Sequence, residues 1–275
     1  MLTRRIVVSV CAAILSASPL VAQTNDGDSG PQTLLRPSDA VWFGAFTVGS
    51  IALSRLDTHI AYWFRDTAQQ TNGTMSALAD YGTRLQETRL TLGALVLYGI
   101  GRLTNSEALA DIGIHGAEAV VATSVACQII RGPLGRARPS RSGLDDPYDF
   151  HYFAGFRQFD ARSFPSIHAS GAFAAATVLV VETSRRNPSA NWVVAPVSYA
   201  IAASPSYARL FMGQHWASDV LMGAFMGVFV GQRVVNYSHD HPHNPMDRFF
   251  LGKHAHGLTL LPLGRGVQIG YSAEF

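Results

Sequence analysis

Six uncharged, mainly apolar runs alternate with charged or Pro/Gly-rich segments along this chain of 275 residues. Ala, Leu, Val, Gly and Met dominate the runs, and none shows the two-residue alternation of a half-buried strand. The pattern therefore predicts an all-α fold with about six core helices. They are expected at 40–54, 90–101, 119–130, 169–181, 187–208 and 220–232.

The two ends of the chain differ from this central part. Residues 1–22 join a basic end to an apolar stretch and a plausible cleavage point, which is typical of a secretory signal peptide. A polar linker at 23–37 leads into a helical domain at 38–236. The remainder, 237–275, combines a His-rich linker with an alternating segment that predicts a C-terminal β-hairpin packed against the helices. We expect an exported protein of the periplasm or cell envelope.

Run length argues against helices that cross a membrane. A spanning helix needs about 20 mainly apolar residues, whereas five of the runs stop at 12 to 15 and are bounded by Arg, Glu or Asp. The remaining run, 187–208, is longer but contains three prolines. A cleaved signal peptide leaves the amino terminus outside the cytoplasm. If all six helices then crossed the membrane, the segments after the third and fifth helices would lie in the cytoplasm, which does not suit an exported protein that acts on external substrates. We therefore favour a soluble domain, or one in peripheral contact with the membrane, over an integral protein.

Composition limits the partners. A formal net charge of +2 is too mild for a nucleic-acid footprint, so no nucleic-acid partner is predicted. Of the two cysteines, Cys11 lies in the predicted signal peptide, which leaves Cys127 without an internal disulfide partner. Five tail histidines have spacings that a metal can use, but a solvated linker is the preferred interpretation and no metal is predicted. These are His239, His241, His243, His254 and His256.

Three polar clusters lie at predicted helix boundaries. "RGPLGRARP" (131–139) supplies guanidinium forks that fit phosphate oxygens. "FPSIHAS" (164–170) begins a helix with a proline suited to the first turn, free N–H groups and a hydroxyl, which together favour an anion. "ARLFMGQHWASD" (208–219) places His215 and Asp219 four residues apart, so the carboxylate can accept from one ring nitrogen and leave the other free. Singly, each cluster also fits a structural role.

Taken together, the clusters resemble the three-part signature of the type 2 phosphatidic acid phosphatase superfamily, which includes bacterial class A acid phosphatases and vanadium haloperoxidases. The matching motifs are Arg131-x6-Arg138-Pro139, Pro165-Ser166-x-His168 and Arg209-x5-His215-x3-Asp219. The resemblance extends over roughly residues 40–235 and implies an α-helical bundle in which the third to sixth helices carry the site.

The resemblance also implies roles. The phosphate is bound by Arg131, Arg138 and Arg209, with added hydrogen bonds from the Ser166 hydroxyl and the Ile167 N–H. His215 attacks phosphorus to form a phosphohistidine, and Asp219 orients it. His168 protonates the leaving oxygen and later activates water. Three departures stand out: Arg131 replaces a lysine, Ile167 a glycine and Ala208 a serine.

We predict a metal-independent phosphatase without a cofactor, which acts on phosphomonoesters or pyrophosphates of a lipid or a small molecule. Arginines rather than a cation offset the phosphate charge in this scheme. One alternative is a vanadium-dependent haloperoxidase, with vanadate in the phosphate site and His215 as its ligand. A second is a non-enzymatic envelope protein that binds phosphate or has a structural role, which the changes at Ile167 and Ala208 favour.

Overall fold

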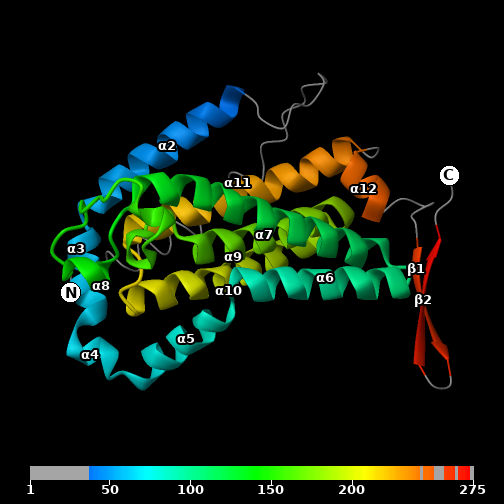
Figure 1. Ribbon diagram of the computed structural model, residues 1–275, viewed down its shortest axis with the longest axis horizontal. Helices are drawn as coiled ribbons and strands as arrows, with labels where there is room; N and C mark the ends of the chain where they lie inside the picture. The colour runs from blue at the N-terminus through cyan, green and yellow to red at the C-terminus, as the bar shows by residue number, and fades with distance from the viewer. Residues whose placement is uncertain (1–36, 242–243, 251–256, 264–265, 273–275) are drawn as a thin grey trace.

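The computed structural model describes residues 37–241, 244–250, 257–263 and 266–272 (Figure 1). The all-α prediction is confirmed. Five of the six apolar runs lie within a helix, and the run 187–208 begins in a 3-10 turn (Pro188–Ala190) before it continues as an α-helix. The helices are α2 (Pro37–Ser54), α3 (Asp57–Arg65), α4 (Thr67–Gln70), α5 (Gly73–Arg84), α6 (Glu87–Leu103), α7 (Glu107–Leu134), α8 (Pro139–Ser142), α9 (Ile167–Arg186), α10 (Asn191–Phe211), α11 (Ala217–Asp240) and α12 (Pro245–Phe250).

The sequence analysis missed the helices between α2 and α6. Helices α3 and α5 are amphipathic rather than uncharged, so they contain no apolar run. Helix α3 buries Ile60, Ala61 and Phe64 on one face and leaves charged residues such as Arg65 on the other. These helices cover the end of the bundle at which the polar clusters lie.

Helices α7, α9 and α11 form the centre of the bundle, with α2, α6 and α10 around them (Figure 1). Three glycines at four-residue spacing let α11 approach α9 closely. A Cβ at Gly223, Gly227 or Gly231 meets a backbone carbonyl oxygen of α9 or its N-cap at 2.3, 2.2 and 2.8 Å. Because Gly223 touches the Ser166 carbonyl, this contact sets the start of α9 against the start of α11.

Aromatic packing attaches the outer helices to this centre. Phe43 and Phe46 of α2 contact Phe225 of α11, at ring-centroid distances of 5.1 and 3.9 Å. On the other side, Tyr199 of α10 lies 5.9 Å from the ring of Phe173 on α9. Both contacts bury large apolar surfaces, so the central helices are held from opposite sides.

The helices are longer than the apolar runs within them. Helices α7, α9 and α11 have 28, 20 and 24 residues, and among the described residues these three are long and apolar enough to cross a membrane. The argument from run length was therefore wrong, because polar residues facing other helices continue each helix beyond its uncharged run. Helix length therefore gives no reason to prefer a soluble domain over an integral membrane protein.

The tail differs in part from its predicted organisation. Helix α11 extends to Asp240, beyond the predicted domain end at 236. Strands β1 (Gly257–Leu263) and β2 (Gly266–Ser272) pair antiparallel, with Leu260 opposite Ile269. Packing of this hairpin against the helices stays a prediction. The predicted signal peptide and the predicted linker, apart from Pro37, lie outside the described residues, as do His243, His254 and His256.

Candidate active site

The three clusters meet at one end of the central helices. Helix α7 ends at Leu134, where Gly135 adopts a left-handed conformation with φ of +64°, and a Cβ there lies only 1.8 Å from the His151 carbonyl oxygen. This turn leads into the buried residues Arg136 and Arg138. A second left-handed glycine, Gly213, lies in the bend between α10 and α11. Both turns return the chain to the start of α9.

The three predicted phosphate-binding arginines converge here. Burial, together with the positive charges of Arg131 and Arg209, lowers the pKa of Arg138 to about 10, so it stays protonated at neutral pH. Within the described part of the chain, Nε of each of these arginines and Nη1 of Arg131 are buried without an acceptor. A buried charged donor without a partner costs free energy. The cluster is therefore suited to an anion that supplies several acceptors.

Orientation of His215 suits a nucleophile. Its Nδ1 lies 2.7 Å from the Ser163 carbonyl oxygen, which can only accept, so Nδ1 carries the proton. Burial lowers the pKa of His215 to about 4, although the Asp219 charge opposes this shift, and the ring is neutral at pH 7. Nε2 then holds a free lone pair, and among the described residues no hydrogen-bond partner occupies it.

Asp219 does not orient His215 in the predicted way. His215 precedes α11 rather than lying in it, and its Nδ1 is 3.7 Å from Asp219 Oδ2, longer than a hydrogen bond. Asp219 instead caps α11, because Oδ2 accepts from the Trp216 N–H at 2.7 Å and from the Ser163 hydroxyl at 2.5 Å. Since the Ser163 carbonyl binds His215, Asp219 positions the ring through Ser163.

A buried ion-pair network, which sequence analysis did not find, supports Asp219. Arg136 donates to Asp219 Oδ1 at 2.5 Å and to Asp57 Oδ2 at 2.8 Å. Burial lowers the pKa of Arg136, but the charges of Asp219 and Asp57 outweigh it and hold the pKa above its usual value. Asp57 also accepts from the Ser218 N–H at 2.9 Å. Arg136 belongs to the first arginine cluster, but its charge is paired with these two carboxylates rather than left for an anion. Asp57 was not predicted because it lies in no recognisable motif.

Helix α9 starts at Ile167, two residues later than predicted from Pro165 as its first residue. Ser166 is the N-cap and its Oγ accepts from the Ala169 N–H at 3.5 Å, while Pro165, after a cis peptide bond, lies outside the helix. The Ser166 hydroxyl therefore has a capping role, and its phosphate contact stays a prediction. Ile167 has no positive φ. It is the first helical residue, so its N–H is one of the groups that a helix leaves free.

The second predicted histidine, His168, lies near His215. The ring centroids of His168 and His215 are 6.4 Å apart. His168 Nε2 lies 3.7 Å from Oε2 of Glu87, the first residue of α6. In the described structure both this oxygen and His168 Nδ1 are buried without a hydrogen-bond partner. Glu87 was not predicted, because it starts a helix with no recognisable motif.

The departure at Ala208 has a packing explanation. Ala208 is fully buried in an apolar cluster with Ile60, Phe64 and Ala79. It lies so near Gly82 of α5 that a Cβ there approaches the Ala208 Cβ to 2.9 Å. The methyl group thus packs α10 against α3 and α5, and no hydroxyl reaches the pocket from this position.

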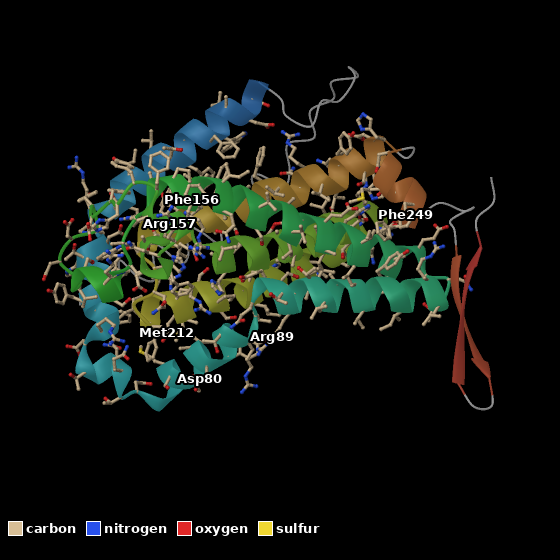
Figure 2. The ribbon with its side chains drawn as sticks, viewed as in Figure 1. Asp80, Arg89, Phe156, Arg157, Met212 and Phe249 are labelled. Atoms are coloured by element: carbon tan, nitrogen blue, oxygen red, sulfur yellow. The ribbon has the colours of Figure 1, made fainter. Side chains whose placement is uncertain are left out.

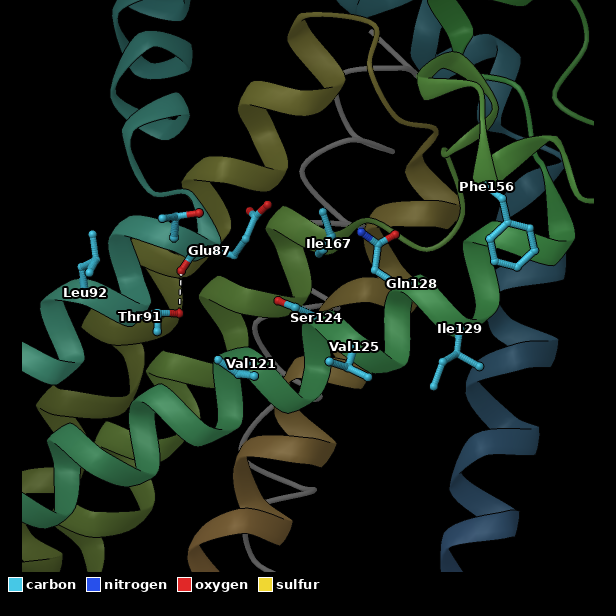
Figure 3. A pocket seen from close by; sticks show the side chains of 11 residues that line it. Glu87, Thr91, Leu92, Val121, Ser124, Val125, Gln128, Ile129, Phe156 and Ile167 are labelled. Carbon is cyan, nitrogen blue, oxygen red and sulfur yellow. Dashed lines mark hydrogen bonds between the residues drawn. The ribbon is translucent and has the colours of Figure 1, made fainter. Parts of the chain in front are cut away.

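An apolar groove begins beside His168. It has a volume of about 660 Å³ and runs between α6 and α7 (Figure 3). Glu87 and Ile167 line it next to His168, and Val121, Val125 and Ile129 form its wall on α7. These three valine and isoleucine side chains are 51%, 54% and 67% exposed. Phe156, labelled in Figures 2 and 3, borders the groove near the arginine cluster.

Comparison with known proteins agrees with this geometry. Residues 115–242 match the family model of the PAP2 superfamily, and this part of the chain, which holds every predicted site residue, belongs to that superfamily. A segment of 72 residues is 40% identical to the lipid A 1-phosphatase of Porphyromonas gingivalis, over 26% of this chain and 15% of that protein. A segment of 104 residues is 33% identical to the lipid A 4'-phosphatase of Bacteroides thetaiotaomicron, over 37% of this chain and 42% of that protein.

These similarities are partial. The matched segments span less than half of either curated relative. No solved structure matches this chain significantly.

Proposed function

We propose that this protein is a phosphatase that removes the terminal phosphate of a membrane lipid through a phosphohistidine intermediate. The observation that carries the proposal is the meeting of unpaired arginine donors with the free Nε2 of a neutral His215. Arginine forks and helix N–H groups match the oxygens of a phosphate, and a neutral imidazole is a competent nucleophile.

The geometry supports the following proposed chemistry. The Nε2 lone pair of His215 attacks phosphorus, and the bond to the leaving oxygen breaks with its electron pair. His168 supplies the proton that this oxygen needs. The new P–N bond leaves a positive ring, which the Ser163 carbonyl and the nearby Asp219 charge stabilise. Water activated by His168 then attacks phosphorus and restores His215.

A lipid is favoured as the substrate because the apolar groove lies next to His168. A water-soluble ester has no apolar part that can cover the wall formed by Val121, Val125 and Ile129. An acyl chain can bury this wall, which gains about 25 cal/mol of free energy per Å² of apolar surface. The two relatives named as lipid A phosphatases support the same class of substrate.

An apolar surface around the bundle supports insertion into a membrane. Large apolar side chains that are 42% or more exposed lie along four helices, and contiguous apolar surface of this kind marks contact with lipid or protein. Helices α7, α9 and α11 are long enough for the roughly 30 Å of hydrocarbon. The residues are Val41, Val48 and Ile51 of α2, Leu92, Leu95, Val96 and Ile100 of α6, Val121, Val125 and Ile129 of α7, and Trp192, Val193, Val197 and Ile201 of α10.

The test compares substrates on the full chain in detergent. We expect kcat/KM for lipid A and diacylglycerol phosphate to exceed that for a sugar phosphate, and acid quenching during turnover to trap a phosphoenzyme. Val125→Trp fills the groove and should lower kcat/KM for the lipids while leaving p-nitrophenyl phosphate unchanged. Val193→Trp, at an exposed position on α10, is the matched control.

Each outcome bears on one part of the proposal. Equal rates for lipids and small esters, unaffected by Val125→Trp, contradict a lipid substrate. The absence of a trapped phosphoenzyme contradicts the intermediate. Bromide oxidation in the presence of vanadate that exceeds phosphatase turnover points to the haloperoxidase instead. Release of the protein by carbonate washing, without detergent, contradicts membrane insertion.

A further inference from the structure

A second buried polar cluster lies at the other end of the central helices. His115 and Arg131 are 16 residues apart on α7, which corresponds to about 24 Å along the helix axis. Glu182 and His168 are 14 residues apart on α9, or about 21 Å. In Figure 2, Phe156, beside the groove, and Phe249 on α12 lie toward opposite ends of the helical bundle. The second cluster is therefore distinct from the phosphate site.

Three side chains from three helices meet in this cluster. His115 Nδ1 lies 2.6 Å from Glu182 Oε1, and His239 Nε2 lies 3.0 Å from the same oxygen. The ligand-type atoms of all three residues are within 4.8 Å of one another. His115 and Glu182 are almost fully buried, and His239 is half-buried. Two imidazole nitrogens and one carboxylate oxygen thus face a common point.

We propose that His115, Glu182 and His239 bind a divalent transition-metal ion, for which Zn²⁺ is the best fit. Two imidazoles and a carboxylate are a frequent protein donor set for Zn²⁺, and one further position stays open for water. Metal ligation also accounts for the convergence of both rings on one point, because Glu182 Oε1 is the nearest acceptor for both of them. A metal ion takes the lone pairs of both nitrogens and the carboxylate together.

The surroundings of His115 give a second, independent observation. Its Nε2 lies 3.6 Å from Asp247 Oδ1, and within the described residues both atoms are buried without a hydrogen-bond partner. Asn244 fixes the other oxygen of Asp247 at 2.7 Å. A ligating histidine usually directs its second ring nitrogen to a carboxylate, which orients the ring. Asp247 is in place for this role once His115 binds a metal through Nδ1.

The charge of the cluster suits a cation. Glu182, Asp247 and Asp111 are carboxylates, and Glu118 has a buried oxygen without a partner in the described structure. Arg186 pairs with Glu182 Oε2 and with Asp111, which leaves Glu182 Oε1 for the metal. The competing explanation is a metal-free network in which protonated His115 and His239 neutralise these carboxylates. The experiment must separate the two.

Metal analysis of the purified full chain tests the proposal. To remove binding by the tail, the background carries His243→Ala, His254→Ala and His256→Ala. After equilibrium dialysis against Zn²⁺ we expect one Zn²⁺ per chain. His115→Ala and His239→Ala should each lose it, and Asp247→Asn should weaken binding by about 10- to 100-fold. His241→Ala, two residues from His239, is the matched control and should keep it.

A spectroscopic measurement guards against variants that fail to fold. Replacement by Co²⁺ in the background protein should produce visible d–d bands of a four- or five-coordinate nitrogen and oxygen site. Zn²⁺ should also raise the thermal midpoint of this protein but not that of His239→Ala. The proposal is overturned if the background protein binds no stoichiometric metal and shows no such bands. It is equally overturned if correctly folded His115→Ala and His239→Ala retain the full equivalent.

Discussion

The two ends of α7, α9 and α11 carry buried polar clusters of opposite character. At one end Arg131, Arg138 and Arg209 have buried donors that find no acceptor among the described residues. At the other end carboxylates predominate, and Glu182 is shared among two histidines and Arg186. Because an unpaired buried charge is costly, the arginine donors favour an anion, whereas the excess of carboxylates at the other end favours a cation. The comparison predicts an anion site at one end and a cation site at the other.

The largest effect should come from the nucleophile. His215→Ala removes the atom that bonds to phosphorus but few packing contacts, so we expect turnover to fall by roughly four orders of magnitude or more with the fold intact. Stopped assays and circular dichroism measure the two quantities. His151→Ala, a half-exposed histidine paired with Asp149 at 2.8 Å, is the control. Wild-type activity in His215→Ala removes the proposed mechanism.

His168→Ala should affect substrates unequally. Loss of the proton donor should slow alkyl phosphates by about 10²- to 10⁴-fold, whereas p-nitrophenyl phosphate has a good leaving group and should keep far more of its phosphorylation rate. Pre-steady-state bursts with each substrate provide the measurement. Glu87→Gln should change alkyl phosphates in the same direction by less, since Glu87 only neighbours His168. Equal losses for both ester types show that His168 is not the leaving-group acid.

The pH dependence should reflect a neutral His215. Its pKa of about 4 lies below the ordinary histidine value, so the phosphorylation rate should be flat from pH 7 to pH 5 with respect to this group. Below about pH 4 the rate should fall about tenfold per pH unit as Nε2 takes a proton. Single-turnover rates, divided by the fraction of substrate dianion, measure this effect. A fall centred near the ordinary histidine value contradicts it.

Stability should respond to the same ionisation. The unfolded chain takes up a proton at a higher pH than the folded chain, because the folded pKa of His215 is lowered. The contribution of His215 to the free energy of unfolding is therefore complete above the unfolded value and is lost as pH falls through the window down to about 4.

The smallest effect on turnover is expected from a chelator. EDTA should leave the rate at room temperature unchanged, because arginines offset the phosphate charge, yet it should lower the thermal midpoint by removing the metal at the far end. His239→Ala should show no such shift. Loss of turnover with EDTA and rescue by Zn²⁺ contradicts the separation of the two ends.

Local patterns were sufficient for much of this protein. Uncharged runs identified six helices, because a helix buried on several sides needs little alternation. The spacing of the three motifs identified the arginines and both histidines, since each motif lies within a few residues. Run length misjudged the helices themselves, because the charged residues that end a run, such as Glu118 and Glu182, lie in the interior of α7 and α9.

The amino-acid sequence by itself determined the helical class and the arginines and histidines that lie together at one end of the central helices. Only the tertiary structure decided which groups become partners over long separations. Asp219 uses one carboxylate oxygen to cap α11 and the other to bind Arg136, 83 residues away, rather than forming a hydrogen bond with His215. His115 and Glu182 meet across 67 residues, and His239 joins them across 57. No local pattern encodes these contacts, because the close packing of α7, α9 and α11 alone brings their ends into register.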